Sequence, residues 1–186
     1  SPYPHQQEAV EAVKEAFQTE SRGKIIMACG TGKTYTSLCI AEDWVGSQKK
    51  SGMVLFLVPS LALMSQTVTE WKNDCSQDFT AFAVCSDSQI GVRRVGQDDI
   101  GDMESFDLAF PATTSAGRLA EKVAQHGGDG MTVVFATYHS LQVISEAQKE
   151  YRLPAFDLII CDEAHRTTGA TLEGADDSNF VAVHKD

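Results

Sequence analysis

The sequence predicts one α/β domain built on a mostly parallel sheet with helices on both faces. Apolar strand-like runs alternate with segments of helical spacing along most of the 186 residues. The run 53–58 is apolar without alternation, which is typical of a strand buried on both faces of a parallel sheet. Because a chain of this length forms one core of ordinary size, we expect residues 1–186 to make a single domain.

Six segments of the first half have the pattern of a helix or a strand. Pro4 marks the start of the first helix, and Gly46 is expected to end the second one. In order, we expect a helix from Pro4 with apolar residues Val10, Val13 and Phe17, a strand over 24–28, a helix over 32–44, a strand over 53–58, a helix with an apolar stripe from Leu61 to Cys75, and a strand over 79–85.

The second half begins with a long irregular region. Residues 86–112, rich in Gly, Asp, Ser and Gln, show no clear period and are expected to form a surface excursion with one short ordered piece. Thr113 and Thr114 should cap the helix that follows. In order, we expect that helix with apolar residues Leu119, Ala120 and Val123, a turn over 126–130, a strand over 131–136, a helix over 139–149 and a strand over 156–161.

Composition and charge exclude several classes of protein. No apolar run approaches the ~20 residues needed to span a bilayer, so no membrane contact is expected. The five cysteines, without a close C-x-x-C pair, indicate neither a disulfide framework nor a zinc site, and we expect free thiols in a reducing, cytoplasmic compartment. The net charge of −11 disfavours nucleic-acid binding over most of the surface, so any such contact should be confined to one edge.

A glycine-containing turn over 27–34, here called the phosphate loop, has the composition of an anion site. Gly30 and Gly32 allow positive φ angles, so that backbone N–H groups turn inward beside the unpaired N–H groups of the following helix. Lys33 would then reach the β- and γ-phosphates of a triphosphate, and the Thr34 hydroxyl would bind a hydrated magnesium ion. The alternative is a glycine-rich turn with a surface lysine.

Two adjacent acids, Asp162 and Glu163, follow the last predicted strand. Asp162 would hold the magnesium ion, usually through water, and Glu163 would orient and deprotonate the attacking water. Read alone, the pair is equally consistent with a solvated strand end. In a parallel sheet the strands end along one edge, here called the carboxyl edge, and ligands bind there. The phosphate loop and the two acids are therefore expected to meet around one magnesium-bound triphosphate.

Two motifs carry a resemblance to a known family. Gly-Thr-Gly-Lys-Thr at 30–34 together with Asp-Glu-Ala-His at 162–165 resembles superfamily 2 helicases and translocases of the DEAH type, specifically their first RecA-like lobe. The loop departs from the usual pattern at Met27, where a glycine is common. Further stretches are most similar to the motor portion of bacterial restriction-modification enzymes, whether single-chain, type I or type III. These stretches are 84–87, 111–114 and 166–170.

The resemblance implies roles residue by residue. Gln6, by itself an ordinary polar residue of a first helical turn, would hydrogen-bond the adenine edge, and His165 would link the nucleotide to a second lobe or the bound strand. The implied sets are Gln6, Gly30, Thr31, Gly32, Lys33 and Thr34 for ATP, Thr34 and Asp162 for Mg²⁺, Lys33, Glu163 and His165 for catalysis, and Ser60, Gln66, Thr137 and Tyr138 for DNA. The DNA contacts would be mostly to phosphates, and the alternative is that the hydroxyl groups only cap helices.

The family pattern continues with a Ser/Thr-Ala-Thr motif and a second RecA-like lobe with an arginine finger, and nothing in 169–186 matches them. We therefore expect the first lobe of a larger ATP-dependent motor acting on double-stranded DNA, with weak or no hydrolysis by the lobe alone. One alternative is a nucleotide-binding module without turnover, which the intact Lys33, Asp162 and Glu163 disfavour. Another is a P-loop phosphotransferase, which would lack the DEAH segment.

Overall fold

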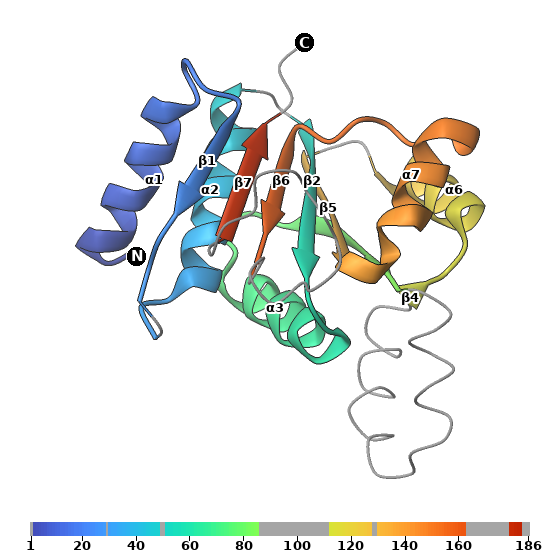
Figure 1. The fold of residues 1–186 in the computed structure, drawn as a ribbon, viewed down its shortest axis with the longest axis horizontal. Helices are drawn as coiled ribbons and strands as arrows, with labels where there is room; N and C mark the ends of the chain where they lie inside the picture. The colour runs from blue at the N-terminus through green and yellow to red at the C-terminus, as the bar shows by residue number, and fades with distance from the viewer. Residues whose placement is uncertain are drawn as a thin grey trace, which may run out of the picture.

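The computed structural model describes residues 2–28, 30–48, 51–85, 112–127, 130–162 and 179–183 (Figure 1). Its helices are α1 (Pro4–Ala16), α2 (Lys33–Gln48), α3 (Leu61–Asp74), α6 (Ala116–His126) and α7 (Leu141–Tyr151), with the 3-10 turn η1 (Tyr138–Ser140) before α7. Its strands are β1 (Arg22–Ile25), β2 (Ser51–Val58), β3 (Phe79–Val84), β4 (Ala112–Thr113), β5 (Gly130–Thr137), β6 (Leu158–Cys161) and β7 (Asn179–Val183). Within these ranges, no helix has both the length and the apolar character of a membrane span.

The strands of the described residues form one sheet in the order β1-β7-β6-β2-β5-β3-β4. The five strands from β6 to β4 pair in parallel, whereas β7 is antiparallel to both of its neighbours, β1 and β6. Since β7 opposes each of them, β1 and β6 run in the same direction, as Figure 1 shows. The prediction of a mostly parallel sheet is confirmed, and β1, β6, β2, β5 and β3 all end at the carboxyl edge.

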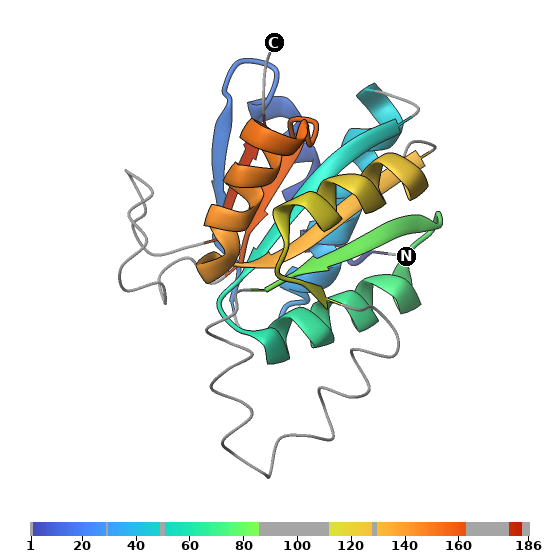
Figure 2. The ribbon, with the colours of Figure 1, turned by 90° about the vertical axis from the view of Figure 1, so that its right-hand side faces the viewer.

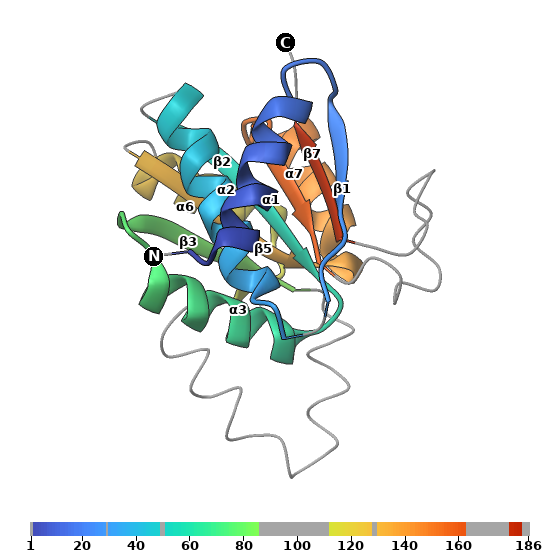
Figure 3. The same ribbon diagram turned by 90° about the vertical axis from the view of Figure 1, so that its left-hand side faces the viewer.

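Helices cover both faces of the sheet, as the sequence predicts. Strand β2 shows why its apolar run is continuous, because its residues are buried alternately on the two sides. Val54, Phe56 and Val58 belong to the core under α2 and α3, whereas Leu55 and Leu57 belong to the core under α6 and α7. Figures 2 and 3 show these two helical layers from opposite sides. The α/β fold with helices on both faces is therefore confirmed.

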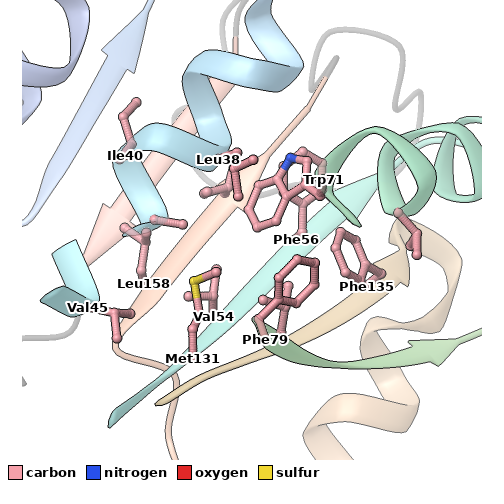
Figure 4. Packing of buried hydrophobic residues seen from close by; sticks show 14 of the residues in the cluster. Leu38, Ile40, Val45, Val54, Phe56, Trp71, Phe79, Met131, Phe135 and Leu158 are labelled. Atoms are coloured by element: carbon pink, nitrogen blue, oxygen red, sulfur yellow. The ribbon is translucent and has the colours of Figure 1, made fainter. Parts of the chain in front are cut away.

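An aromatic cluster fixes α3 on the sheet (Figure 4). The Trp71 ring lies edge-on to three phenylalanine rings, with centroid distances of 5.2 Å to Phe56, 5.5 Å to Phe135 and 6.0 Å to Phe79. Edge-to-face pairs of this kind contribute about 0.5–1.5 kcal/mol beyond the area that they bury. Trp71 is fully buried, so the cluster joins α3 firmly to β2, β3 and β5.

The expectation that Gly46 ends the second helix is wrong, because α2 continues to Gln48. Glycine inside a helix costs about 1 kcal/mol relative to alanine. The buried side chain of Val45 holds the last turn of α2 against the sheet. It packs so closely on Gly52 of β2 that a Cβ atom added to Gly52 would lie 3.0 Å from the Val45 side chain. Packing against the sheet therefore overrides the local preference for a helix end.

Three further expectations differ from the structure. Ser115, not Thr113 or Thr114, caps α6, and its hydroxyl accepts a hydrogen bond from the Arg118 N–H group at 3.4 Å. Thr113 instead pairs with Val84 as part of β4. Strand β1 covers Arg22–Ile25 rather than 24–28, and β7 was not expected as a strand. Most of the predicted excursion over 86–112 lies outside the described residues.

Candidate nucleotide-binding site

The phosphate loop and Asp162 leave the sheet at the same edge. In the two ladders of β7, Ile25 of β1 lies opposite Asn179, and Cys161 of β6 lies opposite Phe180. The last residues of β1 and β6 are therefore level with each other across one intervening strand. β1 and β6 are two strand spacings apart, which corresponds to about 10 Å between the Cα atoms of their last residues. This distance is short enough for one triphosphate and its metal ion to contact both segments.

The phosphate loop has the backbone geometry that its glycines predict. Gly30 and Gly32 adopt φ angles of 77° and 78°, in the left-handed region that favours glycine. The Thr31 hydroxyl donates a hydrogen bond to the Ala28 carbonyl at 2.7 Å and closes the turn. Helix α2 begins immediately afterwards, so its first N–H groups face the loop, as an anion site requires. Cys29 lies outside the described residues.

Gln6 holds the phosphate loop from the side of α1. Its side chain is only 3% exposed, and its Oε1 atom accepts a hydrogen bond from the Tyr3 N–H group at 2.8 Å. Its Nε2 atom donates to the Thr31 carbonyl at 3.2 Å. The side chain also lies so close to the loop that a Cβ atom on Gly32 would be 2.5 Å from Nε2. The structure therefore gives Gln6 a role in shaping the loop, which the sequence did not predict.

A cleft of about 560 Å³ lies between α1 and the segment 23–31. Its walls are mainly apolar, and its polar lining comes from His5, Glu8 and Thr31. His5 Nε2 also lies 3.2 Å from the Thr31 carbonyl oxygen. Since Thr31 is part of the phosphate loop, the cleft is continuous with the candidate site and offers an apolar surface beside it.

Asp162 is fixed through its backbone on both sides. Its N–H group donates to the Leu57 carbonyl at 2.9 Å, and its own carbonyl accepts a hydrogen bond from the Tyr138 hydroxyl at 3.0 Å. Burial raises the pKa of the Tyr138 hydroxyl above its ordinary value and raises the pKa of the neighbouring Cys161 thiol to about 11. Both groups therefore stay protonated near neutral pH. Glu163 and His165 lie outside the described residues.

Thr34, the other predicted magnesium ligand, is also tethered by a buried aromatic side chain. The indole N–H group of Trp71 donates to the Thr34 carbonyl at 3.1 Å, and the Ser37 hydroxyl donates to the same oxygen at 2.7 Å. The sequence identified Trp71 only as a packing residue of α3. The available signal was its indole N–H, because a buried tryptophan usually needs an acceptor for this group.

The four predicted DNA contacts fall into two groups. The Ser60 hydroxyl accepts a hydrogen bond from the Leu63 N–H group at 3.3 Å and caps α3, whereas Gln66 is exposed on the same helix. Thr137 and Tyr138 are instead 0% and 6% exposed. Their hydroxyl groups have partners inside the lobe, so these two side chains are not at the surface that DNA would meet. His139, between Tyr138 and Ser140, is the exposed residue of η1.

A mostly parallel sheet with a glycine loop after β1 and an acid after β6 defines a RecA-like lobe of the helicase type. The chain belongs to the family described as "Type III restriction enzyme, res subunit", whose family model matches residues 1–183. The predicted resemblance to superfamily 2 helicases and restriction-modification motors is thereby confirmed. The chain is a helicase-like lobe of the kind found in restriction-modification enzymes.

Solved structures of type ISP restriction-modification enzymes share this fold. A nuclease-deletion mutant of LlaGI, in complex with a DNA substrate mimic, is 37% identical with a TM-score of 0.74, and the match covers 89% of this chain and 15% of LlaGI. LlaBIII bound to DNA is 40% identical with a TM-score of 0.73, over 91% of this chain and 11% of LlaBIII. The matched region is therefore a small part of much longer enzymes.

Curated relatives from African swine fever virus also match. "Probable helicase A859L" of isolate Tick/Malawi/Lil 20-1/1983 is 28% identical over 165 residues, and that of isolate Pig/Kenya/KEN-50/1950 is 27% identical over the same length. Each alignment covers 89% of this chain but only 16% of the viral protein. The chain thus spans about one sixth of the relatives that it matches.

Proposed function

We propose that this chain is the ATP-binding lobe of an ATP-dependent DNA translocase or helicase within a larger restriction-modification enzyme. The observation that carries the proposal is the shared carboxyl edge, where β1 and β6 end level with each other on either side of β7. A magnesium-bound triphosphate needs both segments. The glycine loop supplies N–H donors for the phosphates, and Asp162 supplies a carboxylate for the hydrated metal ion.

The residues of the loop fit the phosphates of ATP. The positive φ angles of Gly30 and Gly32 turn the backbone around the space in front of α2. The Lys33 ammonium group binds the β- and γ-phosphates as a point charge. Thr34 and Asp162 offer the oxygen ligands that Mg²⁺ prefers, and Mg²⁺ keeps several waters beside them. Glu163 orients the attacking water and accepts its proton.

The adenine base belongs in the cleft beside α1. The cleft adjoins Thr31 of the phosphate loop, and its apolar lining suits a flat aromatic base. Gln6 lies in the first turn of α1 next to the lining residue His5, and Tyr3 and Thr31 already occupy its amide oxygen and nitrogen. A contact from Gln6 to adenine would therefore use the second lone pair or the second N–H hydrogen of its amide.

Hydrolysis depends on a second RecA-like lobe of the parent protein. An arginine finger stabilises the charge of the transition state and contributes about three to five powers of ten in rate. In this proposal residues 1–186 bind ATP, and closure of the second lobe completes the catalytic site. His165, which follows the acidic pair by two positions, links the bound nucleotide to that lobe or to DNA.

Double-stranded DNA is the proposed substrate along which the parent protein translocates. The matched LlaGI and LlaBIII structures are complexes with DNA or a DNA mimic, and this chain has their fold over about nine-tenths of its length. With a net charge of −11, the lobe would meet DNA only along the carboxyl edge, through Ser60 and Gln66 of the β2–α3 region and through η1. Because Thr137 and Tyr138 are buried, η1 would contact DNA through its backbone or His139.

The experiment is a measurement of ATP hydrolysis by the full-length parent protein with and without double-stranded DNA. We expect DNA to stimulate the wild type. Lys33→Ala should weaken ATP binding because the charge facing the phosphates is lost, and Glu163→Gln should retain ATP binding but lose turnover because the proton acceptor is lost.

Matched changes far from the site serve as controls. Lys149→Ala and Glu146→Gln make the same two chemical changes at exposed positions of α7, and both variants should hydrolyse ATP like the wild type. Unaltered hydrolysis in Lys33→Ala and Glu163→Gln would refute the site. Binding of ATP by a wild type that never hydrolyses it, with or without DNA, would favour a nucleotide-binding module instead.

A further inference from the structure

Turn η1 connects the ends of three strands at the carboxyl edge. It follows directly from β5, and the Ser140 hydroxyl donates a hydrogen bond to the Val84 carbonyl at the end of β3, at 3.2 Å. The Thr137 and Ser140 hydroxyl oxygens lie 2.5 Å apart and lock the turn internally. On its other side, the Tyr138 hydroxyl reaches past the end of β2 to the Asp162 carbonyl after β6. A shift of η1 would therefore act on the ends of both β3 and β6, which are three positions apart in the strand order.

The contact made by Tyr138 is placed at a sensitive peptide group. The carbonyl of Asp162 belongs to the planar peptide that joins Asp162 to Glu163, so its direction and the direction of the next N–H group change together. The Asp162 N–H group is already held by Leu57 at 2.9 Å. With the carbonyl held by Tyr138 at 3.0 Å, both polar backbone groups of Asp162, the proposed metal ligand, have fixed partners.

The properties of Tyr138 suit a fixed link. Its side chain is 6% exposed, and the Cys161 thiol is a second hydrogen-bonding neighbour of its hydroxyl. The same turn exposes His139 to solvent. One end of η1 is thus accessible while the adjacent residue is bound to the acidic segment.

We propose that Tyr138 is a positioning residue that couples DNA bound at η1 to the orientation of the Asp162–Glu163 peptide. This inference rests on the proposed function, since it assumes that the acids serve ATP hydrolysis and that DNA meets the carboxyl edge. DNA that shifts η1 moves the Tyr138 hydroxyl and, through it, the Asp162 carbonyl. Tyr138 therefore contributes to the stimulation of hydrolysis by DNA and does not itself touch DNA or ATP.

The test uses Tyr138→Phe in the full-length parent protein, because this change removes one hydroxyl and keeps the ring. The measured quantity is the stimulation factor, the ratio of kcat at saturating double-stranded DNA to kcat without DNA. We expect it to fall about five- to tenfold, which corresponds to one lost hydrogen bond. The Kd for DNA, measured by fluorescence anisotropy, should change less than twofold. If Tyr138 only stabilised the fold, its loss would not lower the stimulation factor while leaving the Kd for DNA unaltered.

Tyr151→Phe is the matched control, because it makes the same change on an exposed side chain at the end of α7, and it should leave stimulation and DNA affinity unaltered. Wild-type stimulation in Tyr138→Phe would overturn the inference alone. An unstimulated wild type would overturn the proposed function and the inference together. If Tyr138→Phe does not fold, the same measurements are made on Ser140→Ala. Reduced stimulation by DNA with retained DNA affinity would support the link through η1, and wild-type stimulation would refute it.

Discussion

At the residue scale, Gly30 and Gly32 have the same backbone conformation but different surroundings. Their φ angles differ by one degree, so alanine would be strained at either position. An added Cβ atom at Gly30 has no heavy atom within 4 Å, whereas one at Gly32 would lie 2.5 Å from the Gln6 side chain. The two positions therefore separate the cost of backbone strain from the cost of displacing Gln6.

We expect Gly30→Ala to weaken ATP binding through strain of about 1–2 kcal/mol, a loss of roughly five- to thirtyfold. Gly32→Ala should weaken binding further, because the methyl group also pushes Gln6 away from Thr31. Titration with a fluorescent ATP analogue measures both effects. The double variant Gly32→Ala, Gln6→Ala should lose less affinity than the sum of the two single losses, because the methyl group then has no Gln6 side chain to displace. Equal affinities in the two glycine variants would contradict a close contact with Gln6.

The sequence predicted the positive φ angles of Gly30 and Gly32 but not the contact of Gln6 with the loop. The spacing of Gly30, Gly32 and Lys33 specifies a local conformation, and local conformation follows from neighbouring residues. The hydrogen bond from Gln6 to Thr31 joins residues that are far apart in the chain, so it depends on how α1 packs beside the loop. No pattern within the first helix contains that information.

At the scale of elements, α3 connects the aromatic core to the candidate nucleotide site. Trp71 packs its ring against Phe56, Phe79 and Phe135, and its N–H group bonds to the Thr34 carbonyl in the first turn of α2. The helix that begins at the proposed DNA contact Ser60 is thus attached to the helix that begins at the phosphate loop. Packing alone would fix α3 on the sheet, and the hydrogen bond additionally fixes the start of α2.

Trp71→Phe should lower the free energy of unfolding by about 2 kcal/mol, because a buried hydrogen bond and part of a large ring are lost. It should also weaken ATP binding several-fold, since Thr34 loses a tether. Phe79→Leu is the control: it disturbs the same cluster at the start of β3, at the opposite end of that strand from the carboxyl edge. Chemical denaturation and ATP titration check the pair. Equal losses of ATP affinity would show that Trp71 acts through packing only.

The sequence predicted elements best where burial leaves a strong pattern. The apolar run of β2 and the stripe of α3 were visible because each is buried against a layer of the fold. Strand β7 was missed for a physical reason. Its five residues follow a polar, acidic segment, and its place and antiparallel direction are set by pairing with β6 and with β1, of which β1 lies far away in the sequence.

At the scale of the whole molecule, β7 joins the phosphate loop to the rest of the sheet. Within the described residues, the ladder of β1 is formed with β7 alone, and β7 in turn pairs with β6. Together with the packing of α2, a strand that belongs to neither motif therefore sets the relative position of Lys33 and Asp162. Any change that loosens β7 should disturb the site without touching its residues.

Val181→Pro tests this dependence, because proline removes a backbone N–H donor from a central strand where Gly23 and Ile160 pair on its two sides. We expect amide hydrogen exchange in β1 to become about tenfold faster or more, with a parallel loss of ATP affinity, since losing about one hydrogen bond or more changes local opening by that factor. The β2 and β5 amides should keep their protection and serve as the internal control. Unaltered exchange in β1 would show that β7 does not secure it.

The pairing of β1 with β7 also sets an order of events during translation. Arg22 is synthesised before its ladder partner, Ala182, and 160 residues (182 minus 22) separate the two in the sequence. The parallel strands β2, β3, β5 and β6 can assemble beforehand, while the emerging β1 must wait beside an incomplete sheet. The strand that leads into the phosphate loop is consequently secured only after these four strands are already in place.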